Sequence, residues 1–558
     1  MKKKQIIGIT AVLTALTMIL LSACGSSNAS TAKPAESAGG SFTRTSWDQP
    51  FPETITVTIA NVETTGFEFY EGDTITDSLW TKRWKDVYNI NVETSWVSQD
   101  YELNMNLAIA AGDLPDMFYV NAVQFSQLLE AGLLEDITDY VASPYISNGM
   151  MNKLVRDALI FETTKVNGRS YAIPRLHYGY ITQAPSLWVR NDWYNEAGAP
   201  ALNTVADVEA LMDEFMNAYD LSYTMILSED LFGFWNSTPS WHSIARVSNG
   251  MRMWVDDGKG GIMSGYEQPE LLDAIAGWRN WYEWGWIRPD FATTTWDNMA
   301  TDIVSGLAGV EYGQNWRGRT HVPAIENFGP EAYWIAFAPP TIDGKKVQIP
   351  IQFPNDYYNV VRKGYEHPEI LPMLCSDYVY VLDEASVMGT MSAADTKPFG
   401  TQAYQHISGP FQVIFDHYPD VHDVLDACAT RVEKFRTGNA QIFYDEIAPW
   451  LDFDGNMDNF DYDVLMGVGR WAQMGHPHSS LAIAIGLEDN GHYVETKLWG
   501  PTPQEVLDKG GITDSIIQEA ITRMIMGIDP LEKWDSVLEE WRQAGGNEMT
   551  AAVNEMYK

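Results

Sequence analysis

The segment Ala110-Ala111-Gly112-Asp113-Leu114-Pro115-Asp116 joins an expected helix to an expected strand and decides how the first sheet begins. Gly112 is able to adopt the left-handed backbone conformation that ends a helix. Pro115 forbids further helix, so the apolar residues from Asp116 to Val120 are expected to form a short strand. In open α/β sheets, the carboxyl end of such a strand faces the crevice where ligands bind.

The residues on either side repeat this alternation of strand and helix. Period-two patterns predict strands over Ile55–Ile59 and Asn89–Trp96. Helices are predicted over Asp77–Val87, Tyr101–Ala111 and Gln124–Leu129. Strands that alternate with helices require crossover connections, so the pattern predicts an α/β fold with a mainly parallel sheet.

The amino-acid composition limits the kinds of molecule that the protein is expected to bind. The 558 residues, 45% of them hydrophobic, are enough for more than one core. Without the three lysines near the start, 33 basic residues face 75 acidic ones, a net charge of about −42. Such a charge excludes nucleic acid and electrostatic binding to anionic lipid, and it favours a neutral or cationic small ligand. Only Cys375 and Cys428 follow residue 24, and the sequence leaves open whether they pair.

The amino terminus has the pattern of an export signal. Lys2, Lys3 and Lys4 precede an apolar run from Ile6 to Leu21 that is too short and interrupted for a permanent membrane helix. Leu21-Ser22-Ala23-Cys24-Gly25 resembles the bacterial lipobox, which implies lipidation of Cys24 and a protein anchored at the extracellular face of the cell membrane. An ordinary secretory signal is the alternative. Residues 1–23 are thus the expected signal and 24–45 a flexible tether.

Several segments together resemble family 1 extracellular solute-binding proteins, the sugar-capturing subunits of ABC importers. They are Gly112–Asp116, Val166–Pro174, Trp188–Trp193 with Gly198–Pro200, and the closing stretch from Met526 through Trp534 and Gly545 to Tyr557. The resemblance covers most of residues 50 to 558. It implies a periplasmic-binding-protein type II-like fold, with two lobes joined by a multi-crossing hinge and a ligand cleft between them.

The lobe boundaries follow from that implied fold. Lobe 1 is expected to comprise residues 46–172 and 303–355, and lobe 2 residues 173–302 and 356–558. The hinge crossings are placed near Ala172–Arg175, Asp302–Gly306 and Tyr357–Val361. Val304–Tyr312 is expected to return to lobe 1 as a strand. The final helix, with Leu531, Trp534, Leu538 and Trp541 on one face, is interpreted as packing.

Ligand contacts are expected at strand ends and at aromatic–polar clusters, because sugar C–H faces stack on rings while hydroxyls need hydrogen-bond partners. For any one candidate, structural packing is the competing interpretation. Trp316 and Trp235 are the leading candidates because polar loops surround them. The ligand-binding candidates are Tyr119, Asn121, Arg175, Tyr178, Trp235, Trp241, Asn315, Trp316, Arg317 and Trp471, with Tyr180, His242 and Gln473 as neighbours.

Metal and cofactor sites receive little support. Asp452, Asp454, Asn456 and Asp458 have the alternate spacing of calcium loops, but Asp463 stands where an EF-hand has glutamate. A solvated acidic loop is the alternative there. His476 and His478 lack further ligands nearby. No metal is therefore assigned, and no cofactor is expected.

The sequence holds no His-Glu-x-x-His, Gly-x-Ser-x-Gly or phosphate-binding glycine motif. The predicted function is a monomeric, lipid-anchored protein, not an enzyme, that captures a carbohydrate, expected to be an oligosaccharide, for an ABC permease. A surface-anchored carbohydrate-active enzyme, a ligand-sensing subunit of a receptor kinase and a peptide-binding protein are the alternatives. The sugar, its length and its linkage cannot be predicted from these residues.

Overall fold

The computed structural model describes residues 43–63, 69–156, 158–176, 184–229, 231, 253–342, 344, 347–351, 355–400, 404, 407–413, 418–498 and 502–556. Internal contacts divide the chain into Met1–Thr43 and Arg44–Lys558, and the elements below belong to the second unit. The predicted signal, Cys24 and nearly all of the tether lie outside the described residues.

The first sheet has five strands in the order β2-β1-β3-β14-β6. Strand β1 runs parallel to β2 and β3, whereas β14 is antiparallel to both β3 and β6. The sheet is therefore mixed. The parallel strands β2, β1 and β3 agree with the predicted alternation, but the expectation of a mainly parallel sheet is wrong, because β14 enters antiparallel between β3 and β6. The strands are β1 (Ile55–Val62), β2 (Ile90–Ser98), β3 (Met117–Val120), β6 (Ala172–Leu176) and β14 (Asn355–Val361).

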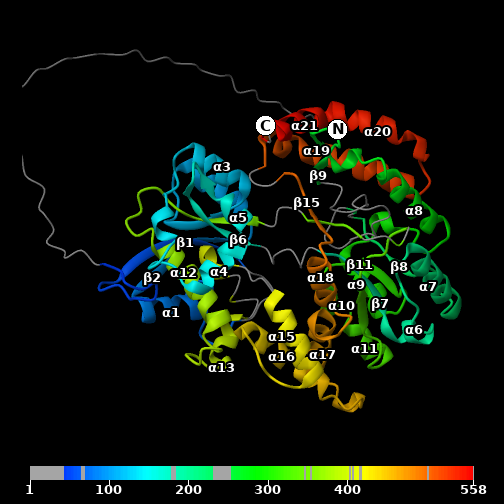
Figure 1. Cartoon of the computed structure of the whole chain (residues 1–558), viewed down its shortest axis with the longest axis horizontal. Coiled ribbons are helices and arrows are strands. Elements are labelled where there is room, and N and C mark those ends of the chain that lie inside the picture. Colours follow the sequence, from blue (N-terminus) through cyan, green and yellow to red (C-terminus); the bar gives the residue numbers. More distant parts are fainter. Residues whose placement is uncertain are drawn as a thin grey trace, which may run out of the picture. The chain divides into compact units, whose positions relative to one another are not determined.

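Helices cover both faces of this sheet (Figure 1). On one face Ile59 and Met117 pack with Trp80 and Trp84 of α1, and with α12. On the other face, apolar residues of β1, β3 and β14 pack against α2 and α3. The helices of this group are α1 (Leu79–Tyr88), α2 (Tyr101–Ala111), α3 (Ala122–Glu130), α4 (Asn148–Arg156), α5 (Ala158–Glu162) and α12 (Ile370–Val379).

The connection that opens the sheet has the predicted form. Helix α2 spans Tyr101–Ala111, and Gly112 ends it with φ of 68°. Asp116 then accepts hydrogen bonds from the backbone N–H and hydroxyl of Thr58 on β1, at 2.9 and 2.7 Å. These bonds hold the start of β3 against β1, so the segment sets the register of the parallel strands.

The second sheet has four strands in the order β12-β7-β11-β8. Only β11 and β8 pair in parallel, and β7 is antiparallel to both β11 and β12. The strands are β7 (Ser186–Arg190), β8 (Met225–Ile226), β11 (Val310–Gly313) and β12 (Trp334–Phe337). The helices around it are α6 (Asn191–Glu196), α7 (Val205–Ala218), α8 (Leu271–Glu283), α9 (Trp296–Val304), α10 (Arg317–Thr320) and α11 (Pro323–Phe328).

These pairings correct part of the expected division. The segment 310–313 was expected in lobe 1, but it is β11 of the second sheet, and residues 356–361 of β14 lie in the first sheet instead of lobe 2. No crossing occurs near Asp302–Gly306, because that segment ends α9 and Ile303 packs with Trp188 of β7. The other two expected crossings are adjacent antiparallel strands, β6 and β14.

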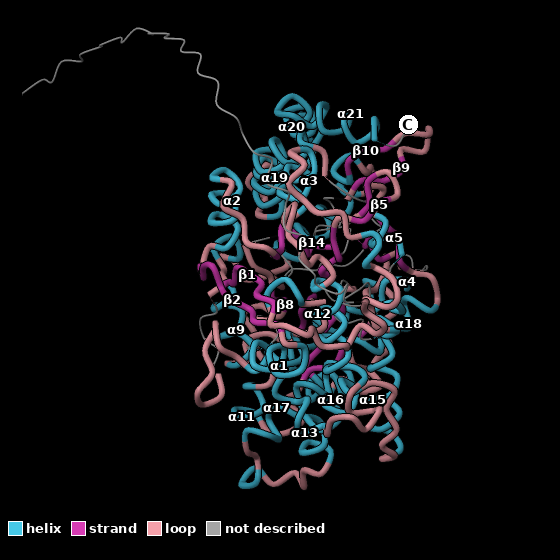
Figure 2. The backbone as a smooth tube through the Cα atoms, turned by 90° about the vertical axis from the view of Figure 1, so that its left-hand side faces the viewer, coloured by secondary structure: helices cyan, strands magenta, loops and turns pink. Residues whose placement is uncertain are grey.

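A third core is almost entirely helical. It contains α15 (Tyr418–Thr430), α16 (Gly438–Leu451) and α18 (Ser480–Asp489), with the short strands β13 (Ile349–Ile351) and β15 (Tyr493–Glu495). Helix α17 (Tyr462–Arg470) packs on α16 and continues into the π-helical turn η9 (Trp471–Gly475). Figure 2 shows α15, α16 and α17 close together.

The carboxyl-terminal helices pack onto the core of the second sheet. Trp534, Leu538 and Trp541 of α20 are buried and Leu531 packs against the same core, as the stripe predicted. The helices are α19 (Gln504–Ile525), α20 (Trp534–Trp541) and α21 (Asn547–Met556). Besides short helical turns, the described residues also form β4 (Lys165–Val166), β5 (Arg169–Ser170), β9 (Trp254–Asp256), β10 (Ile262–Ser264) and α13 (Ala393–Thr396). Among the described residues, none of the helices combines the length and apolarity needed to span a bilayer.

Candidate functional site

An aromatic cluster with one cation lies at the carboxyl end of the parallel strands of the first sheet. Tyr119 of β3 stacks on Tyr101 with ring centroids 4.0 Å apart, and it meets Tyr357 of β14 edge-on at 5.2 Å. The guanidinium of Arg175, at the end of β6, lies 4.3 Å from the Tyr119 ring and 5.7 Å from the Tyr357 ring. Because Arg175 pairs with Tyr357 across the strands, sheet register brings these side chains together.

Two further polar contacts fix this group. Arg175 donates a hydrogen bond to the side-chain oxygen of Gln412, and the Tyr357 hydroxyl donates one to Glu102 at 3.0 Å. Burial raises the pKa values of Tyr101 and Tyr119, so both phenols stay protonated at neutral pH. The cluster therefore combines flat rings, hydroxyl groups and a fixed positive charge.

Asn121 is placed next to this cluster but has a structural role as well. Its side chain caps α3 by accepting a hydrogen bond from the backbone N–H of Gln124 at 3.0 Å. The Gln124 side chain accepts one in return from the Asn121 backbone, which completes a capping box. Tyr119 and Arg175, by contrast, are in direct contact with each other, and their contact with a ligand stays a prediction.

A second polar group lies where β11 ends, in the turn Gln314–Trp316. Asn315 is 7% exposed, and its side-chain oxygen accepts a hydrogen bond from Gln473 at 2.6 Å. The Trp316 indole N–H donates to Gln314 at 3.1 Å, and the ring is half-buried. Ser480 donates to the backbone oxygen of Asn315 at 3.1 Å, which ties the turn to α18.

Arg317 does not lie on a ligand-facing surface. Its side chain is fully buried, and it pairs through two nitrogens with the carboxylate of Glu311, which is equally buried. His321 also contacts Glu311, at 2.6 Å. Burial, the largest single effect, would raise the pKa of Glu311, but the charges and hydrogen bonds of Arg317 and His321 together outweigh it and lower that pKa to about 2. The expectation that Arg317 contacts a ligand is therefore corrected, because this arginine neutralises a buried carboxylate.

Trp471 is half-buried in an aromatic group. Its ring lies 4.4 Å from the His476 ring, 5.2 Å from Tyr333 and 5.7 Å from Trp450. Burial lowers the pKa of His476 to about 4, and its Nδ1 accepts a hydrogen bond from the backbone N–H of His478 at 3.0 Å. Packing, the competing interpretation, accounts for most of the Trp471 environment.

Five of the predicted contacts and neighbours lie outside the described residues. They are Tyr178, Tyr180, Trp235, Trp241 and His242. Their expected roles stay predictions.

The acidic loop candidate does not gather its side chains around a common point. Asp452 forms an ion pair with Arg431 at 2.6 Å. Asp454 and Asn456 instead accept hydrogen bonds from backbone N–H groups within the loop. Within the part of the chain that the structure describes, no group of three or more His, Cys, Asp or Glu side chains is placed to hold a metal ion.

The two cysteines are not paired. Cys375 is buried and Cys428 half-buried, and both thiols are free. Burial raises the pKa of each, which keeps both protonated and unreactive at neutral pH. This settles the alternative that the sequence left open.

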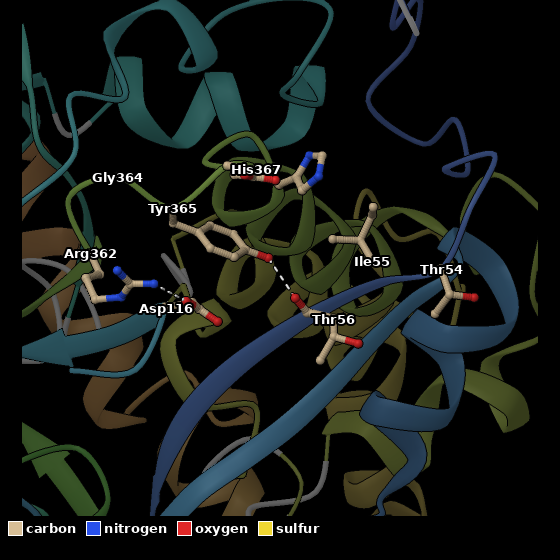
Figure 3. A pocket seen from close by; sticks show the side chains of 9 residues that line it. Thr54, Ile55, Thr56, Asp116, Arg362, Gly364, Tyr365 and His367 are labelled. Atoms are coloured by element: carbon tan, nitrogen blue, oxygen red, sulfur yellow. Dashed lines mark hydrogen bonds and ion pairs between the residues drawn. The ribbon is translucent and has the colours of Figure 1, made fainter. Parts of the chain in front are cut away.

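A hollow of about 500 Å³ lies at the opposite, amino-terminal edge of the first sheet (Figure 3). Its polar groups are largely engaged with one another. Arg362 pairs with Asp116 at 2.7 Å, and the Tyr365 hydroxyl donates to the backbone oxygen of Thr56 at 3.0 Å. The carboxyl edge, with its aromatic cluster, is thus the better candidate site.

Sequence reasoning missed Tyr101, Tyr357, Glu102 and Gln412 as members of the cluster. Tyr357 lies in a segment that was predicted as a crossing, so a signal was present. The sequence contains no signal for the antiparallel pairing of β14 with β3, because that pairing joins residues more than two hundred positions apart. Gln412 was likewise unpredictable, since it follows a short helical turn, η7 (Gly409–Phe411), outside the sheet.

Comparison with known proteins finds a matching family and a curated relative. The family model described as bacterial extracellular solute-binding protein matches residues 71–370. The curated protein Lipoprotein LipO of Bacillus subtilis (strain 168) is 22% identical over 482 residues, which cover 84% of this chain and 86% of that protein.

Solved structures show the same fold at low identity. An HMO-binding, ABC-transporter-associated solute-binding protein from Bifidobacterium longum infantis has a TM-score of 0.58 at 14% identity, covering 90% of this chain and 98% of that one. The alginate-binding protein AlgQ2 has a TM-score of 0.54 at 14% identity, covering 92% and 99%. The S. pneumoniae ABC-transporter substrate-binding protein FusA, in complex with kestose, has a TM-score of 0.56 at 12% identity, covering 90% and 98%.

The mixed sheets and their helices thus confirm the predicted fold class, and the family model covers more than half of the chain. The chain belongs to the family of bacterial extracellular solute-binding proteins.

Proposed function

We propose that this protein captures a carbohydrate, in the first place an oligosaccharide, outside a bacterial cell and delivers it to the permease of an ABC importer. The observation that carries the proposal is the Tyr101–Tyr119–Arg175–Tyr357 cluster at the carboxyl edge of the first sheet. Rings beside hydroxyl and guanidinium groups match a sugar, whose C–H faces stack while its hydroxyls seek hydrogen bonds. The relatives named for binding oligosaccharides or alginate support the same ligand class.

Two lobes built around the two sheets would close on the ligand. The chain leaves the first sheet after β6 and returns to it at β14, which makes these neighbouring strands the natural hinge. The Gln314–Trp316 turn would supply contacts from the second lobe. Closure is favourable only when a ligand satisfies the polar groups that closure buries, so the closed state reports occupancy to the permease.

The protein is proposed to be monomeric and held at the membrane by lipid on Cys24. The lipobox-like segment at residues 21–25 supports this anchor, and the match to a curated lipoprotein agrees with it. The cytoplasmic ATPase is a separate subunit in this scheme.

The decisive experiment measures tryptophan fluorescence and Tm of the mature lipoprotein in detergent across a panel of oligosaccharides. Saturable binding at a hundred times Kd stabilises the folded state by about 2.7 kcal/mol, which raises Tm. The same glycans are recovered afterwards and analysed for length. Binding with intact glycan supports the proposal, and cleavage would replace it with the carbohydrate-active enzyme. Silence across the panel, with peptides tested next, would overturn the carbohydrate class.

A further inference from the structure

Helix α2 is apolar on two opposite sides. On its inner side, Met105 is buried against the first sheet. On its outer side, Leu103 and Leu107 are 54% and 59% exposed, and Ala110 and Ala111 are exposed as well. Residues three and four positions apart are neighbours on a helix surface, so these four outer side chains form one continuous stripe, here named the α2 stripe.

The outer side of a surface helix is normally polar. Helix α7 follows this rule, because Asp213, Glu214 and Asn217 are among its exposed residues. In contrast, the ten residues from Leu103 to Gly112 include no charged side chain, although the whole chain has 75 acidic residues. A single exposed leucine is ordinary, but a continuous exposed apolar stripe is typical of a surface that binds a partner.

The α2 stripe begins next to the aromatic cluster. Tyr101, the first residue of α2, stacks on Tyr119 of that cluster, and Glu102 accepts the hydrogen bond from the Tyr357 hydroxyl. Leu103 is the next residue along the helix and is exposed. A partner bound to the stripe therefore lies beside the cluster and contacts a different side of α2.

Charge limits which partner fits the stripe. Without the amino-terminal lysines, the net charge of about −42 repels anionic lipid and opposes association between two copies of this chain. The uncharged α2 stripe offers another protein an apolar contact with no like charge on the stripe itself. The stripe therefore favours a different protein as its partner over lipid or a second copy.

The length of the proposed tether indicates a membrane protein as that partner. Residues 24–43 precede the folded unit, and these 20 residues span at most about 66–72 Å when fully extended. A lipid on Cys24 would thus keep the folded region within reach of proteins that lie in the same membrane.

We propose that the α2 stripe is the surface through which this protein docks on the permease of its importer. The inference rests on the proposed function, which supplies the permease. The matching surface of the permease is an uncharged, apolar segment on the extracellular side of the membrane. Docking and ligand binding thus use two sides of one helix, with Leu103 and Leu107 facing the permease and Tyr101 in the ligand cluster.

Leu103→Gln/Leu107→Gln tests the docking without adding charge. Leucine and glutamine have similar helix propensities, and neither leucine is buried, so Tm should stay at the wild-type value. Uptake of a glycan that the wild type binds should fall at least about tenfold in cells whose only copy of the protein is the variant, because the apolar contact is lost. The affinity of the purified lipoprotein for the same glycan, measured by calorimetric titration, should not change.

Two matched variants provide the controls. Leu103→Met/Leu107→Met keeps apolar side chains of similar size, so uptake should remain near the wild-type rate. Val155→Gln/Ile512→Gln replaces two similarly exposed apolar residues on α4 and α19 and should change neither uptake nor affinity. Wild-type uptake in Leu103→Gln/Leu107→Gln would overturn the inference. An equal loss of uptake in the α4 and α19 control, or a fall in glycan affinity that matches the fall in uptake, would overturn it too.

A cross-linking experiment separates this inference from the proposed function. A photoreactive benzophenone amino acid replaces Leu107 in intact cells, and mass spectrometry identifies what it captures. We expect a membrane-spanning permease subunit, with a lower yield when Leu103→Gln is also present and none when the same label is placed at Val155. Capture of lipid, of a second copy of this chain or of nothing would overturn the inference. Capture of the permease by a protein that binds no glycan would instead support the docking surface and contradict the proposed carbohydrate ligand.

Discussion

At the residue scale, Glu311 and Arg317 form a buried ion pair, and removing one member of the pair is expected to lower the free energy of unfolding strongly. Both are fully buried, and two nitrogens of the guanidinium contact the carboxylate. Removing water from either charge costs several kcal/mol, and the attraction between the two charges, together with the contact of Glu311 with His321, offsets this cost. Their attraction holds Arg317, the residue that follows the Gln314–Trp316 turn, against Glu311 of β11.

Arg317→Met should therefore destabilise the protein by about 3–5 kcal/mol, because it leaves an uncompensated buried carboxylate. The double variant Glu311→Leu/Arg317→Met should recover most of this loss, since no charge stays buried. Urea unfolding of the wild type and the two variants measures the effect. A double variant as unstable as the single one would contradict the argument that the unpaired charge is the cause.

His476 makes stability depend on pH. Burial, with the nearby His478, lowers its pKa to about 4, below the usual value of about 6.5. Below pH 6.5, His476 binds a proton in the unfolded chain but stays neutral in the folded chain. The free energy of unfolding therefore falls as the pH drops from about 6.5 to about 4. His476→Asn keeps an acceptor near the His478 N–H but does not titrate, so its Tm should fall less between pH 7 and pH 4.5. Parallel Tm curves for the two proteins would refute this role of His476.

The ligand contacts of single residues stay predictions. Tyr119 was identified from its position at a strand end and Arg175 from its position after the Pro174 crossover, and the two side chains lie in contact. Arg317 was also predicted to contact a ligand because of its polar neighbours. In the structure its side chain instead donates hydrogen bonds to Glu311, which lies six residues earlier on β11. A sequence shows the two residues but not whether their side chains are buried together.

At the element scale, the left-handed cap at Gly112 and the helical glycine Gly511 offer opposite tests. Gly112 has φ of 68°, a conformation that costs a residue with a Cβ about 1 kcal/mol or more. Gly511 lies inside α19 with open space where a Cβ would lie, and alanine is favoured there by about 0.5–1 kcal/mol. Gly112→Ala should lower the free energy of unfolding and Gly511→Ala should raise it, measured by urea titration. Equal effects would show that backbone conformation does not determine the outcome.

Local elements followed from the sequence much better than their pairing. The helix over Tyr101–Ala111 has the predicted bounds, and the strands near residues 55 and 90 begin within one residue of prediction. Their periodicity and caps are properties of adjacent residues. The placement of β11 and β14 was wrong because sheet membership depends on partners far along the chain, and short apolar strands fit either sheet.

At the scale of the whole molecule, the proposed lipid anchor on Cys24 predicts where in a cell culture the protein is found. Cys24→Ala should leave the folded region, Arg44–Lys558, intact but release the protein from the cell membrane into the medium. Membrane and medium fractions, compared with the wild type by immunoblot, measure this. Retention of the alanine variant in the membrane fraction would contradict anchoring through residue 24.

The two free thiols have a consequence for how the molecule is made. Cys375 and Cys428 form no covalent crosslink, so assembly of the region after residue 43 needs neither an oxidant nor a thiol-exchange catalyst. Dithiothreitol should leave the Tm of the purified protein unchanged, and the chain should reach its native state in a reducing compartment as readily as outside the cell. The protein is proposed to work on the outer surface of the cell, where disulfides can form, yet Cys375 and Cys428 of its folded region form none.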